Sequence, residues 1–71
     1  MEKNEIKKAL YKQKPIATLL FIRKEVAYYT ASVEMDDANY AIRFEVPVND
    51  MGDADYFPEM DAKLLIRYIS E

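Results

Sequence analysis

The chain has 71 residues, 51% of them hydrophobic and 13% aromatic, and its ten basic and thirteen acidic side chains give a formal net charge of −3. It contains no cysteine and no histidine, which excludes disulfides, thiolate or histidine metal sites, and catalysis of the Ser-His-Asp or Cys-His type. A chain this short forms a single domain (residues 1–71). We expect it to be a binding module rather than an enzyme, with no cofactor.

The first predicted element is a short amphipathic helix over residues 2–12. Ile6 and Leu10 recur at helical spacing, and Asn4 is suited to cap the N-terminus. Pro15 disfavours helix at the residue before it and so separates this segment from the next. A helix of two or three turns is marginal alone in water, so its apolar stripe is expected to dock on the rest of the domain.

Two strands are predicted next. Residues 16–22 are apolar on both alternating faces, which is typical of a central strand covered on two sides. Residues 26–34 form the second strand, joined to the first by a tight turn over residues 23–25. That turn lacks the Asn-Gly pair that favours two-residue hairpins, so the pattern leaves the register open.

The third predicted strand, residues 40–48, has the clearest pattern. Five apolar residues alternate with mostly polar ones, so one face is expected in the core and the other in water. The apolar set is Tyr40, Ile42, Phe44, Val46 and Val48, and the alternating set is Ala41, Arg43, Glu45, Pro47 and Asn49. Pro47 indicates an edge strand, and residues 36–39 supply the preceding turn. Three antiparallel strands in a meander are the economical topology.

The C-terminal part begins with a polar loop, residues 49–55, which holds the single glycine. Its oxygen-rich side chains suggest calcium, but the spacing fails the EF-hand pattern, so we expect no metal. Residues 57–69 are predicted to form a helix, with Met60 and Leu64 among the residues near helical spacing. A fourth strand over residues 63–69 is the alternative, because apolar residues also alternate there.

These elements predict an α+β fold: an N-terminal helix, a three-stranded antiparallel meander and a C-terminal helix, in a two-layer sandwich with both helices on one face of the sheet. The other face is expected to carry Tyr28 or Tyr29 with Ala31 and Val33. So much exposed apolar surface favours a two-fold homodimer packed face to face. The longest apolar run, residues 16–22, is too short to span a membrane, and we expect a cytoplasmic protein.

Charge is distributed unevenly along the chain. Residues 1–24 hold seven basic and two acidic side chains, whereas residues 25–71 hold three basic and eleven acidic ones. The main functional hypothesis is an acidic face that binds another protein, imitating phosphate charge toward a basic site. Its candidate residues are Asp36, Asp37, Asp50, Asp53, Asp55 and Glu59. The plainer interpretation is that acids are simply favoured in turns and at the first turn of a helix.

The alternative hypothesis is a small domain that binds single-stranded nucleic acid. Its candidate residues are Lys7, Lys8 and Lys12 on the N-terminal helix and Tyr28 and Tyr29 on the second strand. Lysines track a phosphate backbone and exposed tyrosine rings stack on bases. The net negative charge of the chain argues against this hypothesis, because the phosphates of nucleic acid repel a negatively charged protein.

Two segments carry a resemblance. Residues 10–17 (LYKQKPIA) and 62–69 (AKLLIRYI) look like parts of small proteins carried by bacteriophages and mobile elements of gut bacteria. That group has no assigned activity. The resemblance implies a phage-like setting, in which small acidic proteins often act by binding a host protein.

Overall fold

The computed structural model describes residues 3–51 and 57–70, and it has the α+β composition and the N-terminal helix that the sequence predicts. The elements in chain order are helix α1 (Lys3–Gln13), strands β1 (Ile16–Arg23), β2 (Val26–Met35) and β3 (Ala38–Pro47), the 3-10 helix η1 (Val48–Met51), strand β4 (Glu59–Asp61) and the 3-10 helix η2 (Ala62–Tyr68). Within the described ranges, no helix is long and apolar enough to cross a bilayer.

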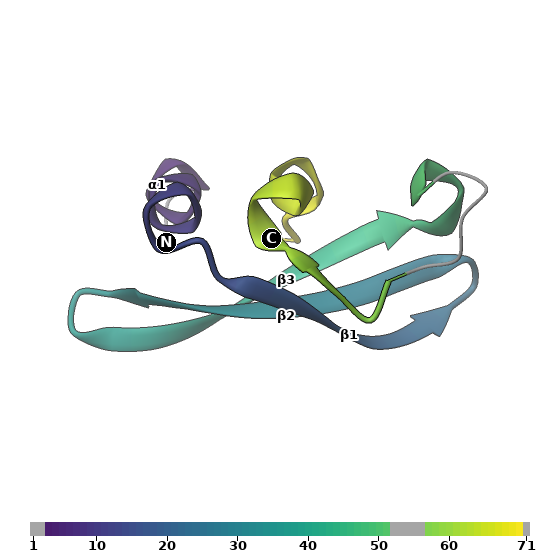
Figure 1. Cartoon of the computed structure of the whole chain (residues 1–71), viewed down its shortest axis with the longest axis horizontal. Helices are drawn as coiled ribbons and strands as arrows, with labels where there is room; N and C mark the ends of the chain where they lie inside the picture. Colours follow the sequence, from purple (N-terminus) through teal and green to yellow (C-terminus); the bar gives the residue numbers. More distant parts are fainter. Residues whose placement is uncertain (1–2, 52–56, 71) are drawn as a thin grey trace.

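The strands form one antiparallel sheet in the order β3-β2-β1-β4. The predicted number of three strands is therefore wrong, because the sheet has a fourth strand, β4. It lies beside β1, where Asp61 pairs with Ile16 and Glu59 with Thr18. α1 and η2 lie over the same side of this sheet (Figure 1). The opposite side is left without a helix from the described residues.

Helix α1 packs on the sheet through its apolar stripe. Leu10 is fully buried, and Ala9 is nearly so. Asn4 lies inside the helix rather than at its cap, because the helix begins at Lys3. At the other end Lys14 adopts a positive φ of 50° and its N–H donates to the Leu10 carbonyl at 3.0 Å, which is the left-handed termination that helices commonly use.

Both hairpins close through two-residue turns. Lys24 and Glu25 have φ of 51° and 64°, and Asp36 and Asp37 have φ of 50° and 62°. Positive φ at both central residues is the type I′ geometry, whose twist matches that of the flanking strands. The predicted tight turn after β1 is thus confirmed, although neither turn contains the glycine that usually accommodates this backbone.

Strand β3 has the one-sided burial that its sequence predicts. Ile42, Phe44 and Val46 are at most 5% exposed, whereas Arg43 and Glu45 are exposed. The inward side of β2 continues this core, and the largest fully buried side chains are Tyr29, Phe44, Leu10, Val33 and Val46. Ala31 and Val33 therefore face the core, not the open side on which the dimer expectation placed them.

The C-terminal segment contains a helix, as predicted, but it is the shorter 3-10 helix η2, and residues 59–61 before it form β4; the alternative strand over residues 63–69 is wrong. β4 leads directly into η2, and Ile69 then forms a bridge to Phe44 on β3. η2 thus crosses the whole sheet, from the β4 edge to the β3 edge, a width of about 14 Å for three strand spacings. Seven residues of 3-10 helix span about 14 Å, whereas an α-helix of that length spans about 10 Å. The stretched form fits the distance.

Strand β1 is the main departure from the sequence prediction, because it is covered on one face only. Ala17 is fully buried and Leu19 partly buried against the core. Ile16 and Leu20 are each 54% exposed, and Phe21 is 52% exposed. α1 and η2 both lie on the core side of the sheet (Figure 1). The other apolar face of β1 is therefore not covered by any helix of the described residues.

Candidate functional site

The side of the sheet facing away from α1 and η2 carries a connected set of apolar and charged side chains, which we call the open sheet face. By strand pairing and burial its central members are Ile16, Thr18, Leu20, Phe21, Val26, Tyr28, Thr30, Arg43 and Glu45. Single exposed apolar residues are common on proteins, but a contiguous patch marks an interaction surface.

A β-bulge creates this patch. Leu19 pairs with Tyr29 on the core side, but the next pair along the ladder is Phe21 with Tyr28, so Leu20 is an extra residue. If Leu20 were paired regularly, Phe21 would lie on the core side like Leu19, because side chains alternate along a strand. The bulge therefore transfers an aromatic ring from the core to the open sheet face.

The Phe21 ring stacks on the ring of Tyr28 at this point. The centroids are 4.6 Å apart and the ring planes differ by 22°. A hollow of about 200 Å³ adjoins the stack, and Leu20 and Arg43 contribute to its lining. Stacked aromatic pairs hold their rings in place, so this ridge presents a fixed apolar shape.

Two rows of side chains cross the open sheet face beside the bulge. Strand pairing places Glu59, Thr18, Thr30 and Arg43 in one row, which we call the threonine row. The next row holds Phe21, Tyr28 and Glu45, which we call the aromatic row. Arg43 ends the first row and Glu45 ends the second, and both are exposed. Opposite charges thus occupy adjacent rows at the same edge.

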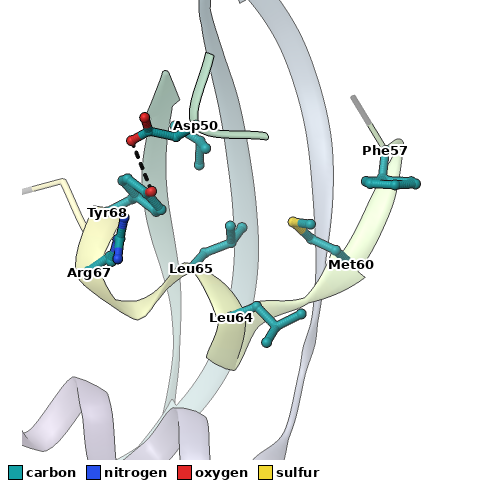
Figure 2. Close-up of a pocket in the computed structure, with 8 residues that line it drawn as sticks. Asp50, Phe57, Met60, Leu64, Leu65, Arg67 and Tyr68 are labelled. Carbon is teal, nitrogen blue, oxygen red and sulfur yellow. Dashed lines mark hydrogen bonds between the residues drawn. The ribbon is translucent and has the colours of Figure 1, made fainter. Parts of the chain in front are cut away.

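A second hollow lies on the helix side, between η1, β4 and η2 (Figure 2). It has a volume of about 300 Å³, and the residues lining it are Val46, Asp50, Phe57, Met60, Leu64, Leu65, Arg67 and Tyr68. The Tyr68 hydroxyl donates to Asp50 Oδ2 at 3.0 Å, and the Arg67 guanidinium lies 5.1 Å from the Tyr68 ring centroid. The polar groups of this hollow therefore interact with one another, and its other lining residues are apolar.

The predicted acidic residues are spread over the molecule. Asp36 and Asp37 form the β2–β3 turn, and Asp50 lies in η1. These two segments lie at opposite ends of the 38 Å long axis (Figure 1). Glu59 is an exposed residue of β4, whereas Asp53 and Asp55 fall outside the described residues. The acids that the structure describes do not form one cluster.

The residues of the nucleic-acid hypothesis are also divided. Lys7, Lys8 and Lys12 lie on α1, and Tyr28 lies on the open sheet face, across the sheet from that helix. Tyr29 is fully buried, and its hydroxyl donates to the Phe57 carbonyl. Burial raises the pKa of Tyr29. A single strand therefore cannot contact all five residues together.

Among the described residues, no three acidic side chains are grouped so that they could hold a metal ion. Most of the oxygen-rich loop over residues 49–55 lies outside those residues.

No protein-family model, curated protein or solved structure matches this chain.

Sequence reasoning missed Leu20 and Phe21 as surface residues. The available signal was the two-sided apolar pattern of residues 16–22, set against only two short helical segments to cover it. That contrast predicts an uncovered face, although the pattern alone does not reveal the bulge that places Phe21 on it.

Proposed function

We propose that this chain is a small non-enzymatic protein-binding module and that the open sheet face is its contact surface. The observation that supports this most directly is the exposure of β1, where Ile16, Leu20 and Phe21 are each more than half exposed. Burying apolar area contributes about 25 cal/mol per Å². Covering these side chains with another protein is therefore a substantial driving force for association.

The sequence pattern of β1 supports the same proposal. A strand that is apolar on both faces is typical of burial on both sides. α1 and η2 cover one side (Figure 1), so a second chain is the natural cover for the other. The Phe21–Tyr28 stack gives that chain a preformed ridge, and aromatic residues of this kind dominate binding energy at protein interfaces.

The acidic residues have a secondary role in this proposal. Asp36 and Asp37 at one end and Asp50 at the other are too widely separated to imitate one run of phosphates. Charges placed in this way act on the rate of association with a charged molecule, an effect that weakens with salt. Burial of the apolar side chains on the open sheet face supplies the affinity.

The proposed setting is a bacteriophage or mobile element acting on a host protein in the cytoplasm. Its support is the resemblance carried by residues 10–17 and 62–69. The dispersed acids fit a modulator that docks by shape and apolar contact better than a charge decoy.

Single-stranded nucleic acid is the second candidate ligand. It is favoured by one observation, the exposed Phe21–Tyr28 stack beside Arg43, since bases stack on aromatic rings next to a cation. Glu45 and Glu59 on the same face oppose it, because they repel phosphate. The lysines of α1 lie on the other side of the sheet and do not offset that repulsion (Figure 1).

The test is capture of partners by the immobilised chain, compared with a Phe21→Asp variant. A matched control is Leu64→Asp, since Leu64 is 63% exposed and lies on the helix-side hollow of Figure 2. Loss of the captured protein with the Phe21 change alone supports the proposal. Loss with the Leu64 change alone assigns binding to the other hollow. A labelled oligonucleotide retarded by the wild-type chain, with affinity falling steeply as salt rises, supports nucleic acid instead.

A further inference from the structure

This inference rests on the proposed function, because it takes the open sheet face as a protein-binding surface, and it names a second copy of this chain, in place of a host protein, as what covers that face. We propose that a second copy of this chain covers the open sheet face, in a two-fold dimer that packs the two sheets face to face. The threonine row and the aromatic row are complementary to each other in charge and shape. A two-fold interface requires such complementarity, because the same patch meets itself.

The charges at the β3 edge are self-complementary. Arg43 and Glu45 lie two residues apart on the same side of β3 and are both exposed. A two-fold axis that crosses the strands at the level of Phe44 reverses the strand direction in the second copy. Arg43 of each chain then faces Glu45 of the other, which gives two symmetric ion pairs at that edge.

The same axis makes the rest of the two rows complementary in shape. It places the aromatic row of one copy over the threonine row of the other. The Phe21–Tyr28 ridge then rests on Thr18 and Thr30, whose short side chains leave room for two rings. Sheets packed in this way lie about 10 Å apart, which suits tall side chains facing short ones.

The position of this axis sets how much of the face is buried. Phe44 lies three residues from Pro47 but six from Ala38, so the two faces overlap over roughly half of the 38 Å long axis. The contact is therefore smaller than the about 800 Å² per partner of a standard interface, which fits a pair that dissociates on dilution.

Strand addition at an edge is the competing mode of self-association, and both edges oppose it. On β3 the Ser70 N–H donates to the Arg43 carbonyl at 2.8 Å, and Ile69 bridges Phe44. Pro47 ends the same strand without an N–H to donate. On the other edge β4 has only three residues, directly after Pro58. Face-to-face packing therefore remains the favourable arrangement.

The first experiment measures the mass of the wild-type chain by sedimentation over a wide concentration range. The proposal predicts twice the 8.3 kDa of one chain, with dissociation on dilution. Arg43→Glu and Glu45→Arg are each expected to weaken the dimer at least about tenfold, because each change places like charges against each other twice. An equimolar mixture of the two variants is expected to form the heterodimer.

The matched controls are Lys8→Glu and Glu5→Arg on α1, which make the same charge changes at exposed positions on the other side of the sheet. They are expected to leave the dimer unchanged. Equal weakening by the controls overturns the assignment to the open sheet face. A mixture that stays monomeric, while circular dichroism shows both variants folded, overturns the two-fold pairing.

A wild-type chain that is monomeric at every concentration overturns the second copy as partner, and this result needs no variant. The proposed function is judged separately by the capture experiment. If the chain is monomeric but Phe21→Asp abolishes capture of another protein, the proposed function stands and this inference fails. If the chain dimerises as described and captures nothing else, the module binds itself.

Discussion

The side-chain amide of Gln13 forms two hydrogen bonds with the backbone of Glu34. Its Nε2 donates to the Glu34 carbonyl at 2.7 Å, and the Glu34 N–H donates to its Oε1 at 2.9 Å. β2 extends past the start of β1 at Ile16, so this stretch of its backbone pairs with β3 on one side and has no strand on the β1 side. The amide takes the place of a strand residue and fastens the end of α1 to the sheet.

Replacing Gln13 by alanine is therefore expected to lower the free energy of unfolding by about 1–2 kcal/mol, the range for two partly exposed hydrogen bonds. Urea denaturation measures the change. The control is Lys12→Ala at the neighbouring exposed position, which is expected to change stability by less than about 0.5 kcal/mol. Equal effects of the two substitutions would show that the amide contributes nothing specific.

The turn after β1 offers a stabilising change. Glu25 has a φ of 64°, and the left-handed conformation costs a residue with a Cβ about 1–2 kcal/mol. Glu25→Gly is expected to raise the free energy of unfolding by about 1 kcal/mol. Asp37→Gly at φ 62° is expected to gain less, because aspartate tolerates this conformation better. Thermal denaturation measures both, and a loss of stability with Glu25→Gly contradicts the type I′ assignment.

The buried Tyr29 hydroxyl gives a pH-dependent prediction. Burial raises its pKa above the ordinary value of 10.0, so the folded chain holds this proton more tightly than the unfolded chain. Its contribution to stability is therefore complete below about pH 10 and is lost as the pH rises toward the folded-state pKa. Tyr29→Phe is expected to reduce the alkaline loss of stability.

At neutral pH the same Tyr29→Phe change is expected to lower the free energy of unfolding by about 1 kcal/mol, because the hydrogen bond to Phe57 is lost. The control is Tyr28→Phe, whose ring lies on the open sheet face. Denaturation curves between pH 7 and 11 provide the comparison. If Tyr28→Phe reduces the alkaline loss as much as Tyr29→Phe, the buried hydroxyl is not its source.

Two phenylalanines allow the core and the open sheet face to be compared. Phe44 is fully buried, whereas Phe21 is 52% exposed. Phe44→Ala is expected to cost about 3–5 kcal/mol, enough to unfold much of a domain this small. Phe21→Ala is expected to cost about 1 kcal/mol through the lost stack with Tyr28. Urea denaturation at low protein concentration measures both, and equal costs would contradict the open position of Phe21.

The sequence predicted β3 correctly because a strand with one buried side and one wet side carries its geometry in its own alternation. Ile42 and Phe44 lie inward and Arg43 lies outward, as that pattern requires. The turns were harder, since Lys24 and Asp36 hold positive φ without glycine. Pairing of the flanking strands holds Lys24 in this conformation, whereas aspartate at Asp36 also tolerates it locally.

The C-terminal segment was predicted only in part, as a helix of the wrong type and length, because its form depends on distant residues. β4 exists through pairing of Asp61 with Ile16, and η2 is stretched to reach Phe44 on the opposite edge. Neither contact leaves a local pattern, and the spacing of Met60 and Leu64 favoured an ordinary helix. The candidate surface was missed for a similar reason, since it depends on a single inserted residue in the β1–β2 ladder.

The most direct test of the open sheet face as the binding surface is a residue-by-residue NMR comparison of the free and the associated chain, by dilution of the chain itself or by titration with a captured partner. The account predicts that the amide signals of Phe21, Tyr28 and Arg43 shift most on association, while those of Leu64 and Arg67, beside the helix-side hollow, stay in place. Shifts centred on Leu64 and Arg67, with Phe21 unmoved, would contradict it.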